Sequence, residues 1–249
     1  VYKRQRLRFA TDVRRLPNIE SAEAVPLSDF GYPHAPYFDV VFAKKARSKA
    51  MFDTGSPSYF AISEPDMQGS RAAGGLTGAW LGFGSAGASL GGAAPNTELA
   101  KIGLKSLKVS DLVLGQVVSE VRGLSPSLLG ARLLDHFIIT LDHQSQTAFF
   151  VPIDPSLRAL PAVPSGFGFS VSYQDTIQIS AIWDGSPAKA AGLEVGDVIH
   201  SVNGVAVSLN DADIRRLIAA LTEEHIELGM DGKTISLEKR EFIDGAEHD

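Results

Sequence analysis

The stretch that most constrains the fold runs from residue 165 to residue 204, SGFGFSVSYQDTIQISAIWDGSPAKAAGLEVGDVIHSVNG. Ser186 followed by Pro187 is a typical helix start, because a serine side chain caps the first free amides and proline fits the first turn. Gly192 is expected to end that helix, and Asn203-Gly204 predicts a tight turn between two strands. The stretch therefore predicts short strands interrupted by one short helix.

These residues resemble a PDZ domain over 165–241, which implies a small β-barrel or sandwich with two helices. The loop Gly166-Phe167-Gly168-Phe169 has consecutive amide N–H groups that can face one way and hold the terminal carboxylate of a peptide. The strand after this loop can accept an extended peptide at its edge, and a helix around 211–221 would form the other wall. The first groove-facing residue of that helix is Asp211, Asp213 or Ile214, so the ligand class stays open. The alternative is a domain that packs against the rest of the chain and binds nothing.

A second stretch, MFDTGSPSYF at 51–60, places the carboxylate of Asp53 at the end of an apolar run. Two carboxylates held close together share a proton, so one can activate water while the other acts as general acid. Gly55 would let the backbone approach and supply an amide. The hydroxyl of Thr54 could reach a partner loop, and that of Ser56 could bond the carboxylate. The structural alternative is an Asx turn at Asp53.

The FDTGS loop resembles the active-site loop of retropepsin-like aspartic proteases, and the resemblance covers about residues 37–152. Leu128-Leu129-Gly130 before the helical spacing of SLLGARLLDHF is similar to the family's second signature, in which an apolar pair and a glycine pass beside the catalytic loop. A hairpin, FIITLDHQSQTAFFVP with its turn at 143–146, follows in the same order. The glycine-rich segment 74–92 takes the place of the flap, a mobile hairpin or loop that closes over substrate. Gly78, Ala79 and Trp80 are its expected substrate-facing residues.

The resemblance implies a bacterial endopeptidase with a closed β-barrel lobe, in which Asp53, Thr54, Gly55 and Ser56 form half of the catalytic site. No second D-[ST]-G occurs in the sequence. The partner carboxylate is therefore expected from a homodimer, or from an upstream lobe lying outside this sequence. The substrate is expected to be a peptide or protein, and the PDZ domain would bind a C-terminal or extended peptide. The rival interpretation is a non-catalytic peptide-binding adaptor in which the lobe is a scaffold.

Composition excludes several other chemistries. The chain has no cysteine, so disulfides, thiolate metal sites and cysteine nucleophiles are ruled out. The net charge of −6 argues against a general nucleic-acid binder. The match of residues 82–87 to G-x-G-x-x-G is followed by more glycine rather than by a helix pattern, so a dinucleotide site is not predicted. The expected mechanism uses two carboxylates and a water, so no metal or organic cofactor is implied.

The sequence divides into segments of different character. VYKRQ at the start is similar to a translated sequencing adapter and is expected to be an artefact. Prolines in IDPSLRALPAVP indicate a linker. A periplasmic or cell-envelope location is an expectation from the resemblance alone. The predicted segments are the artefact (1–5), a connecting segment (6–36), the protease-like lobe (37–152), the linker (153–164), the PDZ domain (165–241) and a tail (242–249).

Overall fold

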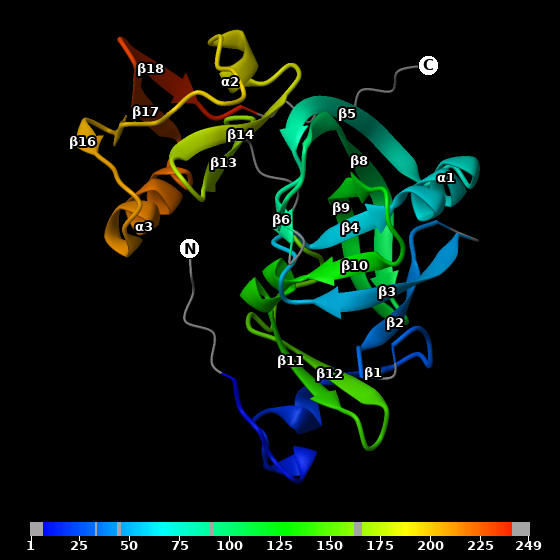
Figure 1. Cartoon of the computed structure of the whole chain (residues 1–249). Coiled ribbons are helices and arrows are strands. Elements are labelled where there is room, and N and C mark those ends of the chain that lie inside the picture. Colours follow the sequence, from blue (N-terminus) through cyan, green and yellow to red (C-terminus); the bar gives the residue numbers. More distant parts are fainter. Residues whose placement is uncertain (1–6, 33, 44–45, 90–91, 162–165, 241–249) are drawn as a thin grey trace. The chain divides into compact units, whose positions relative to one another are not determined.

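The computed structural model describes residues 7–32, 34–43, 46–89, 92–161 and 166–240 (Figure 1). The predicted adapter segment and the C-terminal tail lie outside the described residues. Contacts divide the chain into two compact units, Leu7–Ala79 with Lys101–Val163 and Trp80–Ala100 with Pro164–Asp244. We call the first unit the lobe and the second the C-terminal unit. Most of the glycine-rich segment therefore clusters with the C-terminal part of the chain.

The lobe consists mainly of strands, as predicted. Its elements are η1 (Val13–Arg15), η2 (Ile19–Ser21), β1 (Glu23–Pro26), β2 (Tyr37–Val41), β3 (Arg47–Asp53), β4 (Phe60–Ser63), α1 (Glu64–Ala72), β9 (Leu112–Arg122), β10 (Ser127–Gly130), η3 (Ala131–Asp135), β11 (Phe137–Asp142) and β12 (Thr147–Pro152). Two further strands run between the units, β5 (Leu76–Ser85) and β8 (Asn96–Val109).

Six strands of the lobe close on themselves. They pair in the order β8, β2, β3, β10, β4 and β9, and β9 pairs back with β8. Closing a sheet in this way satisfies the backbone groups that an edge strand would expose. The enclosed core contains Phe38, Phe60 and Leu129, each with no exposed side-chain area. The result is a closed barrel with β10 between β3 and β4.

The helix indicated by the spacing of Leu129, Leu133, Leu134 and Phe137 is wrong for most of its length. The chain forms strand β10, then the single 3-10 segment η3, and then strand β11. All four residues of β10 are buried, and the strand has a hydrogen-bonded neighbour on each edge. A strand covered on both faces shows no alternation of apolar and polar residues, and its sequence is easily taken for a helix.

The predicted hairpin at the end of the lobe is confirmed. β11 and β12 pair antiparallel from Phe137↔Pro152 to Asp142↔Thr147, and β1 adds to the other edge of β12. The described part of the predicted linker has no helix or strand, but it is not detached from the lobe. Leu160 is buried, and its amide donates to the carbonyl of Leu114 at 2.8 Å.

The described part of the C-terminal unit contains the helices α2 and α3 and several short strands. Its elements are β6 (Ala88–Ser89), β7 (Gly92–Ala93), β13 (Phe169–Tyr173), β14 (Ile177–Trp183), α2 (Pro187–Ala190), β15 (Ser201–Val202), β16 (Val205–Ala206), α3 (Asp211–Ala220), β17 (His225–Met230) and β18 (Lys233–Glu238). β13 pairs with β14, and the last four strands form a sheet in the order β16-β15-β17-β18. The residues that join them into one core include Ile179, Leu217 and Leu228.

The local signals of this unit behave as predicted. The Ser186 hydroxyl accepts from the amide of Lys189 at the start of α2, and Pro187 is the first helical residue. Gly192 follows that helix with φ +73°. Asn203 and Gly204 have φ +50° and +74° between β15 and β16. Each signal depends on atoms within a few residues, so the sequence alone is sufficient to predict it.

Candidate functional site

The Asp53 loop is held by its own backbone. β3 ends at Asp53, whose Oδ1 accepts from the amide of Gly55 at 2.8 Å. The carbonyl of Asp53 also accepts from the amide of Ser56 at 3.1 Å. This geometry is an Asx turn, and it leaves the half-buried carboxylate oriented at a strand end. Both sequence interpretations of Asp53 accommodate the turn.

The hydroxyls of this loop differ from expectation. The Ser56 Oγ lies 3.2 Å from the Ser58 Oγ, so the structure pairs Ser56 with a neighbouring serine rather than with the Asp53 carboxylate. Ser56 is buried, and its hydroxyl is satisfied locally for that reason. Thr54 is exposed.

Gly130 approaches the Asp53 loop from the neighbouring strand. β10 pairs parallel with β3 so that Gly130 lies opposite Asp53, and its amide donates to the carbonyl of Tyr59 at 3.0 Å. A Cβ at position 130 would lie 2.1 Å from the carbonyl oxygen of Ser58 and 2.8 Å from that of Ser56. Only glycine permits this approach of two backbones. The apolar pair and glycine of the sequence therefore lie beside the Asp53 loop.

Arg122 is a neighbour of Asp53 that the sequence did not indicate. Burial lowers the pKa of the Arg122 guanidinium, and the negative charge of Asp53 opposes that shift. Its Nη1 donates to the carbonyl of Pro126 at 2.6 Å, which ties the end of β9 to the loop before β10. Nothing in the local sequence marks this arginine, because the connection between β9 and β10 brings it toward the end of β3.

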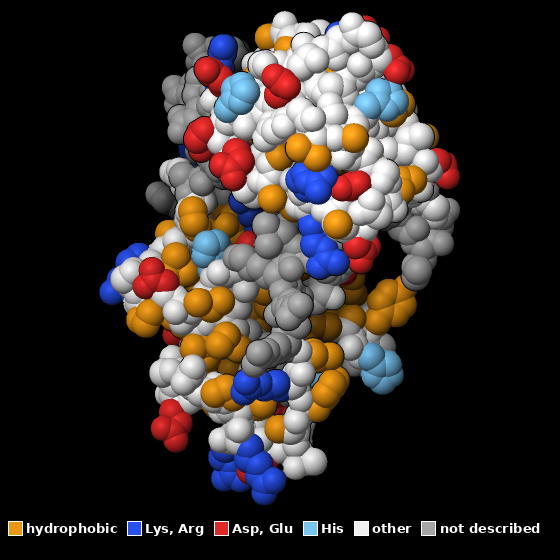
Figure 2. Space-filling view, turned by 90° about the vertical axis from the view of Figure 1, so that its left-hand side faces the viewer, with side chains coloured by type: hydrophobic (Ala, Val, Ile, Leu, Met, Phe, Trp, Pro, Cys, Tyr) orange, Lys and Arg blue, Asp and Glu red, His pale blue; other side chains and the backbone are white. Residues whose placement is uncertain are grey.

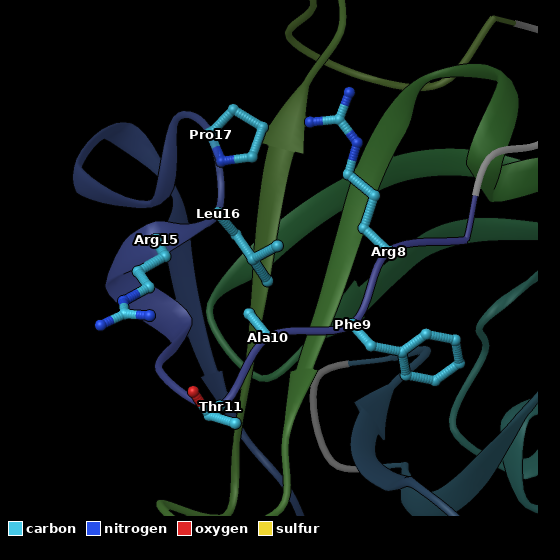
Figure 3. Close-up of a pocket in the computed structure, with 7 residues that line it drawn as sticks. All are labelled: Arg8, Phe9, Ala10, Thr11, Arg15, Leu16 and Pro17. Atoms are coloured by element: carbon cyan, nitrogen blue, oxygen red, sulfur yellow. The ribbon is translucent and has the colours of Figure 1, made fainter.

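The other features of the described residues that could form a site have fewer groups suited to catalysis or binding. No group of three or more His, Asp or Glu side chains there could hold a metal ion. A hollow of about 560 Å³ is lined by Arg8–Thr11 and Arg15–Pro17, and Figure 3 shows the two arginine side chains leaving the chain in different directions. Figure 2 shows both acidic and basic side chains on the face in view. No helix in the described part is long and apolar enough to cross a membrane.

The predicted flap residues lie on β5, where the boundary between the two units falls. Gly78 and Ala79 belong to the lobe, and Trp80 belongs to the C-terminal unit. The segment was expected to be a hairpin or loop, and it belongs to a hairpin. β5 and β8 are neighbours in one sheet, and the short antiparallel pair β6–β7 lies between them in the sequence. Farther along β5, residues 82–84 pair with β14.

The loop Gly166–Phe169 is positioned by bonds to its carbonyl groups. The amide of Ala188 donates to the Phe167 carbonyl at 2.9 Å, and that of Trp183 donates to the Gly168 carbonyl at 3.0 Å. In a trans peptide the following N–H points opposite to the carbonyl. The amides of Gly168 and Phe169 are therefore directed away from α2 and β14, and Gly168 has φ +79°, which favours glycine.

β13 presents an open edge. It is the terminal strand of its sheet among the described residues, with β14 on one side only. Phe169 lies opposite Ile182, next to the hydrogen-bonded pair Gly168 and Trp183. Antiparallel pairs alternate between bonded and non-bonded, so the N–H and C=O of Phe169 point to the open side. An extended chain could continue the sheet there.

α3 carries apolar side chains both inside and outside the core of the C-terminal unit. Leu217 and Ala220 face the core, and Ile214 and Ile218 are half-buried one turn apart outside the core cluster. The opposite flank of α3 borders a hollow of about 610 Å³ lined by Asn203, Arg216, Ala219, Ala220 and residues 223–225. The two isoleucines therefore occupy the other flank of the helix.

Of the three candidates for the first groove-facing position, Asp213 serves the start of the helix. Its Oδ2 accepts from the Ser208 hydroxyl at 2.9 Å and from the Asn210 side chain at 2.7 Å. Asp211 is largely exposed and pairs with Arg215. Ile214 is the candidate that remains half-buried without a polar role.

The Asp213 bonds predict a pH dependence. The Ser208 hydroxyl, then the Asn210 amide, hold the pKa of Asp213 below its ordinary value. A carboxyl with a lowered folded pKa stabilises the protein above the unfolded pKa of about 3.9, and loses this effect as pH falls through the folded value. Asp213→Asn should therefore lower the melting temperature at about pH 7 and have no effect near about pH 2. Thermal melts of both proteins across this range would measure it; an equal deficit at both ends would contradict it.

Comparison with known proteins identifies the family to which part of the C-terminal unit belongs. Residues 178–229 match the family model of a PDZ domain. This region is a PDZ domain. The matched residues run from β14 through α2 and α3 into β17. The loop 166–169 and the open strand β13 come directly before them in the sequence.

One curated relative matches a short stretch of the chain. The Drosophila melanogaster protein "Regulator of G-protein signaling loco" is 50% identical over 44 residues, which are 18% of this chain and 3% of that protein. The chain thus spans a small fraction of the relative it matches.

Proposed function

We propose that the chain binds extended peptides along β13, with the peptide's terminal carboxylate held by the amides of the loop Gly166–Phe169. The observation that carries this proposal is the open edge of β13, where the N–H and C=O of Phe169 point outward beside the two loop amides. Peptides add to a sheet edge through main-chain bonds, and side-chain pockets supply the specificity. The presence of a PDZ domain supports the same function.

The apolar wall of the peptide site is formed by Ile214 and Ile218 of α3. Both are half-buried although they lie outside the core cluster, as expected for side chains that border a groove. A wall of two isoleucines favours an apolar side chain at the end of the peptide, because burying it removes apolar area from water. The ligand is then a chain with a free, apolar C-terminus.

Ile218→Asp should weaken peptide binding by at least about 10-fold, because it places a charge against an apolar ligand group. The probe is the heptapeptide that the full chain selects from a library displayed with free C-termini, measured by fluorescence anisotropy. The matched control is Ala212→Asp on the exposed face of the same helix, which should bind as the unmodified chain does. Equal affinity of both variants, or of the amidated probe, would reject this site.

We also propose that the lobe is half of an aspartic endopeptidase. The support is the arrangement at Asp53, where a carboxylate lies at the end of β3 and the Gly130 strand passes between β3 and β4. Asp53 would pair with an aspartate of a second lobe, share one proton with it, and remove a proton from the attacking water. Thr54 is exposed and free to contact the partner loop.

The second lobe comes from another copy of the chain or from a separate D-[ST]-G lobe. The full chain should be assayed with a quenched-fluorescent peptide library over a range of protein concentrations, alone and with an added lobe of that kind. Activity rising with the square of concentration supports the homodimer, whereas activity only with the added lobe supports the two-lobe form. Tight peptide binding with no turnover in either assay would support the adaptor instead.

A further inference from the structure

Strand β5 occupies the edge of β14 that faces away from β13. Gly82 lies opposite Trp183, Phe83 opposite Ile182 and Gly84 opposite Ala181. The amide of Asp184 donates to the carbonyl of Leu81 at 2.9 Å. All of these residues belong to the C-terminal unit. The glycine-rich segment thus pairs with one side of β14, whose other side pairs with β13, the proposed peptide site.

Two glycines are required for this pairing. A Cβ at Gly82 would lie 2.7 Å from both the Ile182 carbonyl oxygen and the Trp183 Cε3. A Cβ at Gly84 would lie 2.2 Å from the Ser180 carbonyl oxygen, and the residue has φ +143°. Successive side chains of a strand face opposite sides, so Leu81 and Phe83 share one face, where they are 60% and 51% exposed. The contact is thus built from backbone against backbone.

Trp183 contacts residues on both sides of β14. Its amide holds the carbonyl of Gly168 in the carboxylate-binding loop, and its buried ring lies against Gly82. Ile182 is likewise paired with Phe169 on one side and with Phe83 on the other. Ordering one edge of β14 therefore lowers the entropy cost of ordering the other.

We propose that the peptide groove and the glycine-rich strand are positively coupled through β14, so that a peptide bound at β13 strengthens the pairing of β5. The coupling is reciprocal, and loosening β5 must lower peptide affinity by the same factor. This inference rests on the proposed peptide binding. In the proposed peptidase the same segment is the flap, and the PDZ ligand then acts as an effector of the flap strand.

Hydrogen exchange of the full chain, with and without the selected heptapeptide at saturation, tests the coupling. We expect the amides of residues 82–84 and of Asp184 to exchange more slowly by about 5-fold when peptide is bound. Gly84→Ala should lower peptide affinity by a similar factor. The matched control is Gly123→Ala, where a Cβ meets no atom within 4 Å, and it should leave affinity unchanged.

The possible results distinguish the proposed coupling from the proposed peptide binding on which it rests. Protection of 169–173 without any change at 82–84 would overturn the coupling and leave peptide binding intact. Absence of protection at 169–173 would overturn both. The exchange measurement on the unmodified chain decides the matter even where Gly84→Ala fails to fold.

Discussion

In the proposed peptidase, Asp53→Asn should reduce peptide cleavage by at least about 10³-fold, as removal of a catalytic group commonly does. The amide keeps the size of the carboxylate and can still accept from the amide of Gly55, so the turn at the end of β3 is preserved. What is lost is the group that takes a proton from water. Initial rates on the quenched-fluorescent substrate measure the effect.

The matched control is Asp39→Asn, which removes a carboxylate from the neighbouring strand β2. Asp39 pairs with Lys49, which lies opposite it on β3, and it accepts from Ser28. Its cleavage rate should match that of the unmodified chain. Peptide binding should be unchanged in both variants. Undiminished turnover by Asp53→Asn would reject the peptidase proposal.

Gly130→Ala should destabilise the lobe by about 3 kcal/mol, at the upper end of what an overpacked position costs. The added methyl group would lie 2.1 Å from the Ser58 carbonyl oxygen, and that oxygen is backbone held between two strands. Relief requires β10 to shift away from β3 and β4, which would also displace the Asp53 loop. Urea unfolding followed by circular dichroism measures the change in free energy.

Gly123→Ala provides the control for Gly130→Ala as well. It makes the same chemical change in the loop that leads to β10, but its Cβ meets no atom within 4 Å and its φ is ordinary. Its free energy of unfolding should change by no more than about 0.5 kcal/mol. Similar losses in the two variants would show that glycine is needed for chain flexibility rather than for close approach at Asp53.

Much of the PDZ domain was predictable from the sequence. The Ser186 cap, the Pro187 start and the Asn203-Gly204 turn are each satisfied by atoms within three residues. The helix α3 was predictable, but which of its residues would face a bound peptide was not. Which residue faces outward depended on the role of Asp213, whose carboxylate is used by Ser208 and Asn210. The spacing of apolar residues in a helix does not reveal that Asp213 is already bonded at the helix start.

Two features of the structure were not predicted from the sequence pattern. β10 was taken for part of a helix because all four of its residues are buried, so its sequence lacks the alternation of apolar and polar residues. The glycine-rich stretch was expected to be a hairpin or loop and belongs to the β5–β8 hairpin, but the pairing of residues 82–84 with β14 was not expected. Its glycines carry no apolar pattern since the contact that they make is between backbones.

The sequence by itself determined the mainly β class, the PDZ domain, the loop Gly166–Phe169 and the turn at Asp53, because caps, turns and short motifs act over a few residues. Only the tertiary structure decided that residues 127–130 form a strand between β3 and β4, that Arg122 is a neighbour of Asp53, and that β5 pairs with the edge of β14 opposite β13. Those contacts join residues far apart along the chain, and they arise from strand order and close backbone packing rather than from local preference.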